Sequence, residues 1–290
     1  MHLNPSYRPA VASVLVTGCS SGFGKLTALL FARHGHTVFA TMRDPAKAGP
    51  MEAMAAEEGL EVHVLALDVT DPGSVTAAVA DAEAAAGGSL DVVVNNAGIE
   101  LRGPVESVSD DEVLAQFETN VFGVIRVVRA VVPAMRARGA GVIVNVSSIA
   151  GLVARPYAGL YSASKHALEG LSEALHHELR PFGIRVAVVE PGQFETDLLA
   201  NAIVAEGFGP DSPYRAASDS FDVAVRGLVP DGKPAPAEVV AETIVAVAFD
   251  SMAGLRHLVG TDADLVMSVR RSGDFEHFDR TIRAALDWDP

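Results

Sequence analysis

Six short apolar runs alternate along this chain with longer, alanine-rich segments. The runs lack the polar–apolar alternation of a half-exposed strand, so we expect both faces to be covered, as in a parallel sheet. The intervening segments are long enough to be crossover helices, and this order predicts a doubly wound, mostly parallel α/β sheet with helices on both faces. The expected strands are Ala12–Thr17, Thr37–Thr41, Val62–Leu67, Asp91–Val94, Gly141–Val146 and Ile184–Glu190, with a seventh near His257–Val259. The expected helices are Gly22–His34, Met51–Glu58, Pro72–Ala86, Asp110–Arg138, Tyr157–Arg180 and Pro236–Asp250.

We expect a single Rossmann-type domain over residues 1–290. A chain of 290 residues with 49% hydrophobic residues can bury a large core, and no Pro-, Gly- or Ser-rich linker divides it. The irregular segment Asp197–Pro236 follows the sixth expected strand, on the side where open α/β sheets bind ligands. It predicts a substrate lid at about 197–236, with a variable surface loop as the alternative. A C-terminal helical extension is expected at about 261–290.

Charge and cysteine content exclude several classes of function. The formal net charge of −15 and the pI near 4.9 argue against nucleic acids and membrane surfaces as partners, because both require basic patches. Cys19 is the one cysteine, which excludes an intrachain disulfide and a thiolate zinc cluster, and no other ligand set has metal-site spacing. The N-terminus has no apolar signal-peptide core. We therefore expect a cytoplasmic protein without a metal.

A glycine-rich turn follows the first expected strand. Gly18, Gly22 and Gly24 lie between that strand and the first expected helix. Glycines let a backbone approach a phosphate closely, and a helix N-terminus offers N–H groups and partial positive charge to an anion. The spacing is a variant of the dinucleotide-binding fingerprint, and in this strand–turn–helix setting it favours a dinucleotide site over a simple tight turn.

The end of the second expected strand bears on the choice of cofactor. An acidic residue there binds a ribose hydroxyl, whereas an arginine accepts a 2′-phosphate. Met42 stands where the acid is expected, and Arg43 follows it. Asp44 lies about 20 residues past the last glycine, which is the spacing of the ribose acid, but it also precedes a proline and suits a turn or cap. We favour NADP(H) over NAD(H).

Two further strand ends carry polar residues. Asp68 ends the third strand, where it suits either the adenine amine or the N-cap of the next helix. The turn Asn95-Asn96-Ala97-Gly98 follows the fourth strand and has the small and amide residues that can line a dinucleotide cleft.

Tyr161 and Lys165 form a candidate acid–base pair. They are four residues apart in an expected helix, so they lie on one face, about one turn and ~6 Å of rise apart. A phenol with a pKa near 10 is a weak acid–base catalyst at neutral pH, but a nearby ammonium favours its ionised form. The pair is a short motif that also arises by chance, and the preceding glycine turn gives it significance.

Taken together, these motifs resemble the short-chain dehydrogenase/reductase family. They are Thr17-Gly18-x-x-x-Gly22-x-Gly24, Asn95-Asn96-Ala97-Gly98, Asn120, Ser148, Tyr161-x-x-x-Lys165 and Pro191-Gly192, in that order. The resemblance covers about residues 12–260. The sequences of the glycine turn and the second strand end are most similar to the branch that contains 17β-hydroxysteroid and retinol dehydrogenases.

The resemblance implies a role for each motif. Tyr161 exchanges a proton with the substrate oxygen, Lys165 lowers the pKa of Tyr161 and holds the nicotinamide ribose, and Ser148 hydrogen-bonds the substrate oxygen. Asn120 anchors a water relay to Lys165, and Thr196 holds the nicotinamide carboxamide. The expected catalytic residues are Asn120, Ser148, Tyr161 and Lys165. The expected cofactor-binding residues are Gly18, Ser20, Ser21, Gly22, Phe23, Gly24, Arg43, Asp68, Val69, Asn95, Ala97, Gly98, Tyr161, Lys165, Pro191, Gly192, Phe194 and Thr196.

The sequence therefore predicts an NADP(H)-dependent oxidoreductase that interconverts an alcohol with a ketone or aldehyde. A mainly apolar pocket is expected from Ile99–Pro104, Ile149–Gly159, Phe194 and the lid, which favours a steroid-, retinoid- or polyketide-like substrate. Two alternatives are an acyl-thioester ketoreductase and a non-catalytic dinucleotide-sensing regulator. The expected partners are a small-molecule substrate and further copies of the chain, in a homodimer or homotetramer.

Overall fold

A seven-stranded parallel sheet forms the centre of the protein in the computed structural model, which describes residues 11–195, 202–229 and 232–288. The order of its strands is β11-β7-β6-β4-β1-β2-β3, and every neighbouring pair runs parallel. The strands are β1 Ser13–Thr17, β2 Thr37–Met42, β3 His63–Ala66, β4 Val92–Asn95, β6 Gly141–Val146, β7 Ile184–Pro191 and β11 Arg256–Val259. The predicted doubly wound α/β sheet is confirmed, and the expected strands match within one or two residues.

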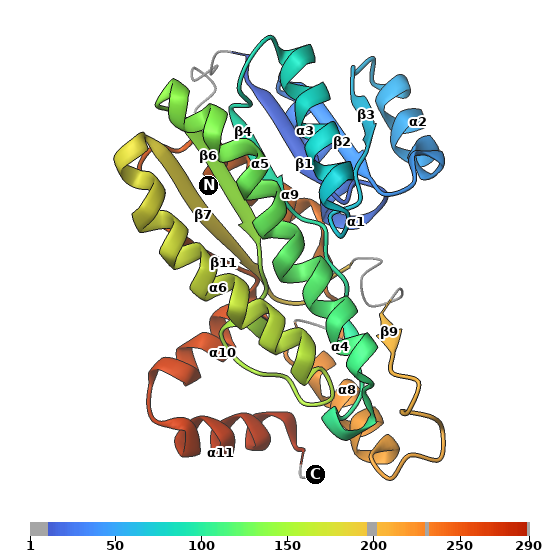
Figure 1. Cartoon of the computed structure of the whole chain (residues 1–290). Coiled ribbons are helices and arrows are strands. Elements are labelled where there is room, and N and C mark those ends of the chain that lie inside the picture. Colours follow the sequence, from blue (N-terminus) through green and yellow to red (C-terminus); the bar gives the residue numbers. More distant parts are fainter. Residues whose placement is uncertain (1–10, 196–201, 230–231, 289–290) are drawn as a thin grey trace.

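Helices cover both faces of this sheet (Figure 1). One face carries α3 Pro72–Ala86, α5 Gly123–Arg138 and α6 Gly159–Leu179, whose apolar side chains join one core cluster. The opposite face carries α1 Gly22–Arg33, α2 Gly49–Glu57 and α9 Glu238–Phe249, whose apolar side chains join a second cluster. The strands are buried on both sides, which is why their sequences are continuous runs of Val, Ile and Leu.

Local sequence signals set the ends of these helices. The Asp71 side chain accepts a hydrogen bond from the Gly73 N–H and caps α3, and Pro72 occupies its first turn. Gly87, with a φ of 72°, ends the same helix in the left-handed conformation. These are the residue types that favour helix starts and stops.

The segment Asp110–Arg138, expected to be one helix, contains an interruption. It consists of α4 Asp110–Phe117, the π-helical turn η3 Glu118–Phe122, and α5. A Cβ on Gly123 would lie 2.8 Å from the Cβ of Val69, so glycine there lets the helix pass close to the β3–α3 connection. Apolar periodicity does not reveal one inserted residue, so the π turn was not predicted.

The segment 197–236 is more regular than expected in its described part. It contains the helix α8 Arg215–Arg226 and two short strands, β9 Ile203–Val204 and β10 Ala235–Pro236. β9 pairs with β5 Leu101–Arg102, and β10 pairs with β8 Phe194–Glu195. The flanking glycines and prolines suggested a loop, but pairing with two segments of the cavity wall orders the chain around α8. Two more helices, α10 Thr261–Arg271 and α11 Phe275–Leu286, follow β11.

The sheet positions a ligand site at its carboxyl edge. From β1, the chain builds β2 and β3 on one side and then β4, β6, β7 and β11 on the other, so the strand order reverses between β1 and β4. Loops diverge at such a switch point and leave a crevice outside the strand ends. Among the described residues, no helix has the length and apolar content needed to cross a bilayer.

Candidate active site

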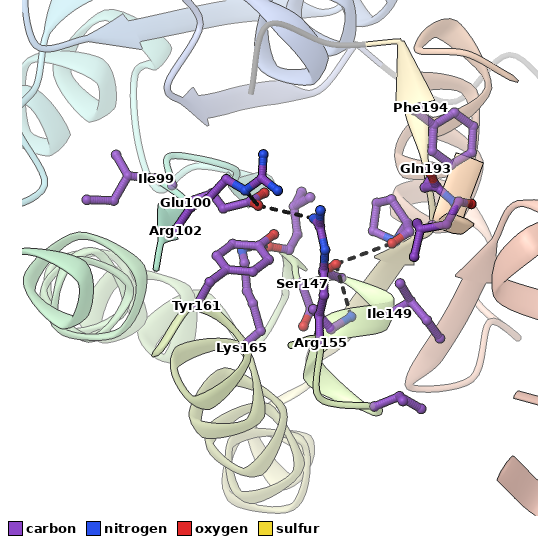
Figure 2. Close-up of a pocket in the computed structure, with 18 of the residues that line it drawn as sticks. Ile99, Glu100, Arg102, Ser147, Ile149, Arg155, Tyr161, Lys165, Gln193 and Phe194 are labelled. Atoms are coloured by element: carbon purple, nitrogen blue, oxygen red, sulfur yellow. Dashed lines mark hydrogen bonds and ion pairs between the residues drawn. The ribbon is translucent and has the colours of Figure 1, made fainter. Parts of the chain in front are cut away.

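A cavity of about 1060 Å³ opens at this carboxyl edge. Its lining runs from the glycine turn after β1, past the ends of β4, β6 and β7, to α8 and α11. Figure 2 shows Tyr161 and Lys165 beside Glu100, Arg102 and Arg155, with Gln193 and Phe194 on the opposite side. The cavity therefore places the expected nucleotide-binding turn and the expected acid–base pair in one continuous space.

The glycine turn has the shape that a phosphate site requires. Gly18 and Gly22 adopt φ values of 74° and 53°, which disfavour other residues. A Cβ on Gly24 would lie 2.4 Å from the Gly18 carbonyl oxygen, so only glycine allows α1 to begin so close to the turn. Because the first N–H groups of a helix lack partners within it, this turn fits the pyrophosphate of a dinucleotide. The expected residues Gly18, Ser20, Ser21, Gly22 and Phe23 line the cavity.

The turn after β4 is fastened to the glycine turn. The Thr17 hydroxyl accepts hydrogen bonds from the N–H groups of Asn96 and Ala97, both at 3.0 Å. The Asn96 amide donates to the carbonyl oxygens of Thr17 and Gly18 at 2.9 and 3.1 Å. Asn96, Ala97 and Gly98 line the cavity.

Asn95 takes a different position from the one expected. Its side chain is buried between β4 and β6, where its amide donates to Asn145 Oδ1 at 2.8 Å. Asn145 donates in turn to the Ser172 hydroxyl of α6 at 2.9 Å. Asn95 therefore helps to connect β4 and β6 to α6. Its neighbour Asn96 belongs to the predicted turn but was not among the expected cofactor-binding residues, and it lines the cavity.

Arg43, and not Asp44, faces the nucleotide end of the cavity. Arg43 is exposed and lines the cavity directly after β2. Asp44 instead caps the short helix η1 Pro45–Ala48, where its carboxylate accepts a hydrogen bond from the Ala46 N–H at 3.1 Å. The capping alternative for Asp44 is thus confirmed.

Asp68 lines the cavity at the end of β3, together with Val69. Its carboxylate accepts hydrogen bonds from the Thr70 N–H and hydroxyl at 2.9 and 2.8 Å. The N-cap of α3 is Asp71, so the capping alternative for Asp68 is wrong.

Ser148 and Tyr161 are brought together at the centre of the cavity. Ser148 follows β6 and caps the short helix η4 Ile149–Gly151, accepting from the Ala150 N–H at 3.1 Å. Tyr161 lies in the first turn of α6 and is 7% exposed. Burial and the negative charge of Glu100 raise the pKa of the Tyr161 phenol above its ordinary value, while the Ser148 hydroxyl and Arg155 oppose this rise.

Lys165 lies beside Tyr161, and its expected role in lowering the Tyr161 pKa stays a prediction. Its Nζ donates to the Val146 carbonyl oxygen at 2.9 Å and lies 5.7 Å from the centre of the Tyr161 ring. Burial lowers the pKa of Lys165 to about 8, although Glu169 and Glu100 oppose the change. For both Tyr161 and Lys165, the removal of water around the charged form changes the pKa more than the neighbouring charges do.

Asn120 lies at the π turn and is fully engaged in local hydrogen bonds. Its Oδ1 accepts from the Ile99 N–H at 2.9 Å, and its amide donates to the Ile99 carbonyl oxygen at 3.0 Å and the Ser164 hydroxyl at 3.1 Å. These bonds hold the segment after β4 against α6. A water relay from Asn120 to Lys165 stays a prediction.

The turn after β7 forms the opposite wall. Pro191, Gly192 and Phe194 line the cavity, and the Phe194 ring contacts Phe23 edge-on at 6.0 Å between ring centres. A Cβ on Gly192 would lie 2.4 Å from the Asp262 carboxylate, which accepts a hydrogen bond from the Gln193 N–H at 2.8 Å. Thr196 lies outside the described residues.

A charged wall is the main feature that the sequence analysis missed. Glu100, Arg102, Arg155 and Asp222 all line the cavity and alternate in charge. The other lining residues from 99–104 and 149–159 are apolar, as expected, so these charged side chains are an exception within a mainly apolar cavity. Glu100, Arg102 and Arg155 lie inside those two segments, and their charge was the sequence signal that could have predicted this wall. No group of potential metal ligands forms a cluster in the part of the chain that the structure describes.

The chain is similar to known proteins in sequence and in fold. The family model for short-chain dehydrogenases matches residues 12–206. A 3-ketodihydrosphingosine reductase of Bacteroides thetaiotaomicron is 42% identical over 208 residues, which cover 72% of each chain. A retinol dehydrogenase 8 of Bos taurus is 39% identical over 264 residues, which cover 87% of this chain and 82% of the relative. A crystal structure of a short-chain dehydrogenase from Streptomyces avermitilis has a TM-score of 0.77 at 33% identity, and covers 95% of this chain and 99% of that one.

Proposed function

Since the chain belongs to the short-chain dehydrogenase family of NAD(P)-dependent oxidoreductases acting on CH–OH groups, we propose that it uses NADP(H) to interconvert an alcohol with a ketone or aldehyde on a hydrophobic small molecule. The observation that carries this proposal is the placement of Ser148, Tyr161 and Lys165 in the cavity that also contains the glycine turn. Binding residues alone would suit a sensor, but this hydroxyl pair beside a buried lysine suits proton transfer.

The nicotinamide of the bound cofactor supplies or accepts the hydride. During reduction, the Ser148 hydroxyl donates a hydrogen bond to the carbonyl oxygen, and Tyr161 Oη gives that oxygen a proton. During oxidation, Tyr161 Oη receives the hydroxyl proton. A phenol is protonated at neutral pH, and burial raises the pKa of Tyr161 further, so Tyr161 carries the proton needed for reduction. Lys165 holds the ribose hydroxyls and supplies positive charge near the phenol.

Arg43 supports NADP(H) as the cofactor. Its guanidinium lines the nucleotide end of the cavity, and the nearest acid in sequence, Asp44, is used in a helix cap. A guanidinium binds a phosphate through two parallel hydrogen bonds, so Arg43 suits a ribose 2′-phosphate. Asp68 and Val69 suit the adenine, and the glycine turn suits the pyrophosphate.

The far end of the cavity supports an apolar substrate. Its lining there includes aliphatic and aromatic side chains from α8, α10 and α11, together with Trp288 after α11: Phe221, Val225, Val266, Phe275, Phe278, Ile282, Leu286 and Trp288. The relatives named after retinol and ketodihydrosphingosine also support this substrate class. We propose that the segment 197–236 is the substrate lid of a single-domain, cytoplasmic enzyme that forms a homodimer or homotetramer.

The test is turnover by Tyr161→Phe. With NADPH and a panel of apolar ketones and aldehydes, followed by the absorbance of the reduced nicotinamide, the wild-type protein should show activity. The variant should lose about 10²–10⁴-fold in kcat, because it removes the general acid. Tyr214→Phe is the matched control, since Tyr214 packs in a separate small cluster with Leu101 and Phe208. Equal activity of Tyr161→Phe and the control would contradict the assigned role.

A further inference from the structure

Four side chains from three segments close a ring of ion pairs in the wall of the substrate cavity. Arg155 Nη1 lies 3.2 Å from Glu100 Oε1, and Arg155 Nη2 lies 2.9 Å from Asp222 Oδ1. Arg102 Nε lies 3.8 Å from Glu100 Oε1, and Arg102 also pairs with Asp222 Oδ2. Each guanidinium therefore bridges the same two carboxylates. Glu100 precedes β5, Arg102 belongs to β5, Arg155 precedes α6, and Asp222 belongs to α8.

The ring is partly dehydrated. The Glu100 side chain is 3% exposed, whereas the other three side chains are 22–25% exposed. Burial raises the pKa of Glu100 despite both arginines. Burial would also raise the pKa of Asp222, but its bonds to Arg102 and Arg155 outweigh this and hold the pKa below its ordinary value. An unpaired charge in this ring would be energetically unfavourable, because the ring has little access to water.

The net charge of the ring affects which substrates can bind beside it. Two guanidiniums in a cavity wall are natural partners for the carboxylate of a ligand. Here Glu100 and Asp222 already neutralise both, so a third carboxylate beside the ring would add a negative charge that neither of its guanidiniums compensates. We propose that Glu100 and Asp222 are specificity-determining residues, which exclude carboxylate-bearing molecules from the substrate cavity and favour uncharged alcohols and carbonyl compounds. This inference rests on the proposed function, whose substrate class it narrows.

The neighbouring aromatic residues connect the ring to the apolar part of the cavity. Phe221 directly precedes Asp222 in α8, and the Arg155 guanidinium lies 5.9 Å from the centre of its ring. On its other side, Phe221 contacts Trp288 with ring centres 4.9 Å apart. Trp288 is the single tryptophan of the chain and lines the cavity. Its fluorescence therefore reports on ligands that enter the cavity, without any need for turnover.

The experiment titrates Trp288 fluorescence of the full chain with decanol and decanoate, which share an apolar chain and differ in charge. The wild-type protein should bind decanol at least about tenfold more tightly than decanoate. Glu100→Gln and Asp222→Asn each leave the wall with one net positive charge and an incompletely paired guanidinium. Both variants should bind decanoate about tenfold or more better than wild type, with decanol affinity changed much less.

Asp219→Asn is the matched control. It makes the same chemical change in the same helix, but Asp219 is 61% exposed and pairs with Arg215 at 3.3 Å. Its ratio of decanol to decanoate affinity should equal that of wild type. Equal wild-type binding of both ligands, or an unchanged ratio in both ring variants, would overturn the proposal. Loss of both ligands from both variants would show a structural anchor, and would overturn it as well. Because binding is measured without turnover, these results are independent of the Tyr161→Phe test.

Discussion

At the scale of single residues, burial affects the pKa values of the proposed catalytic pair, Tyr161 and Lys165, more strongly than their spacing in the sequence does. The four-residue interval puts Tyr161 and Lys165 on one face of α6. It does not specify that Lys165 turns to the Val146 carbonyl oxygen, or that the Glu100 carboxylate acts on the phenol. Both the raised pKa of Tyr161 and the lowered pKa of Lys165 follow from removal of water around the charged form.

Arg43→Ala tests the cofactor preference. Loss of the guanidinium should raise KM for NADPH about 10–100-fold, since charge-assisted hydrogen bonds to a phosphate contribute about 1.5–3 kcal/mol. KM for NADH should change little, because NADH has no 2′-phosphate. Lys47→Ala is the control, since it removes a positive charge from the helix η1 that follows Arg43. Equal losses with NADPH and NADH would contradict the role of Arg43.

At the scale of elements, a buried charge cluster connects α6 to the sheet, one turn beyond the proposed catalytic pair. Glu169 of α6, one turn beyond Lys165, pairs with Arg256 of β11. Glu190 of β7 pairs with the same guanidinium at 2.9 Å, and Glu173 at 2.7 Å. Glu169 and Glu190 are 6% and 2% exposed, so one arginine is shared between two buried carboxylates. This clamp of Glu169, Glu190 and Arg256 connects α6, the helix that carries Tyr161, to β7 and β11.

Glu169→Gln tests the clamp through the pH dependence of stability. Burial raises the pKa of Glu169 from 4.5 to about 7, although Ser147 and Arg256 oppose the rise. Between these values the folded state keeps a proton that the unfolded state releases, so the free energy of unfolding falls as pH rises from about 4.5 to about 7. The variant lacks this loss. Relative to wild type, its free energy of unfolding should increase by about 1–3 kcal/mol between pH 5 and pH 8, measured by urea denaturation.

Glu173→Gln is the control for this measurement. Glu173 pairs with the same Arg256 but is 56% exposed, and its hydrogen bond to Arg256 holds its pKa below the ordinary value. Its neutralisation should therefore give no such increase with pH. If the difference in the free energy of unfolding between Glu169→Gln and wild type did not change between pH 5 and pH 8, Glu169 would be ionised throughout this range.

At the scale of the whole molecule, the proposed cofactor end and the proposed substrate end of the cavity are built from different parts of the chain. In the described residues, the two large core clusters end at Val259 and include nothing from α10 or α11. These two helices lie at one end of the molecule, beside the carboxyl edge of the sheet (Figure 1). They contribute to the cavity wall, and so the substrate end can vary without affecting the cores.

Deletion of residues 274–290 tests this division. The cores should stay intact, so the melting temperature should fall only slightly and KM for NADPH should change little. The apolar wall of α11, including Phe278 and Leu286, would be lost. KM for an apolar substrate should therefore rise about tenfold or more, since two buried side chains contribute about 1.5–3 kcal/mol each. An unchanged substrate KM would exclude α11 from the substrate site.

The sequence by itself determined the parallel sheet, the glycine turn, the end of β2 and the Tyr161–Lys165 pair. Each of these depends on neighbours within a few residues: apolar runs, glycines at positive φ, or one helical turn. Only the tertiary structure decided that Asp44 caps a helix, that Asn95 faces β6, and that the π turn points Asn120 inward. It alone also brought Glu100, Arg155 and Asp222 into one ring, because these residues are 55 and 67 positions apart in the chain. Ion pairs between distant residues leave no periodicity in a sequence, and their charges resemble those of any exposed surface until the fold buries them.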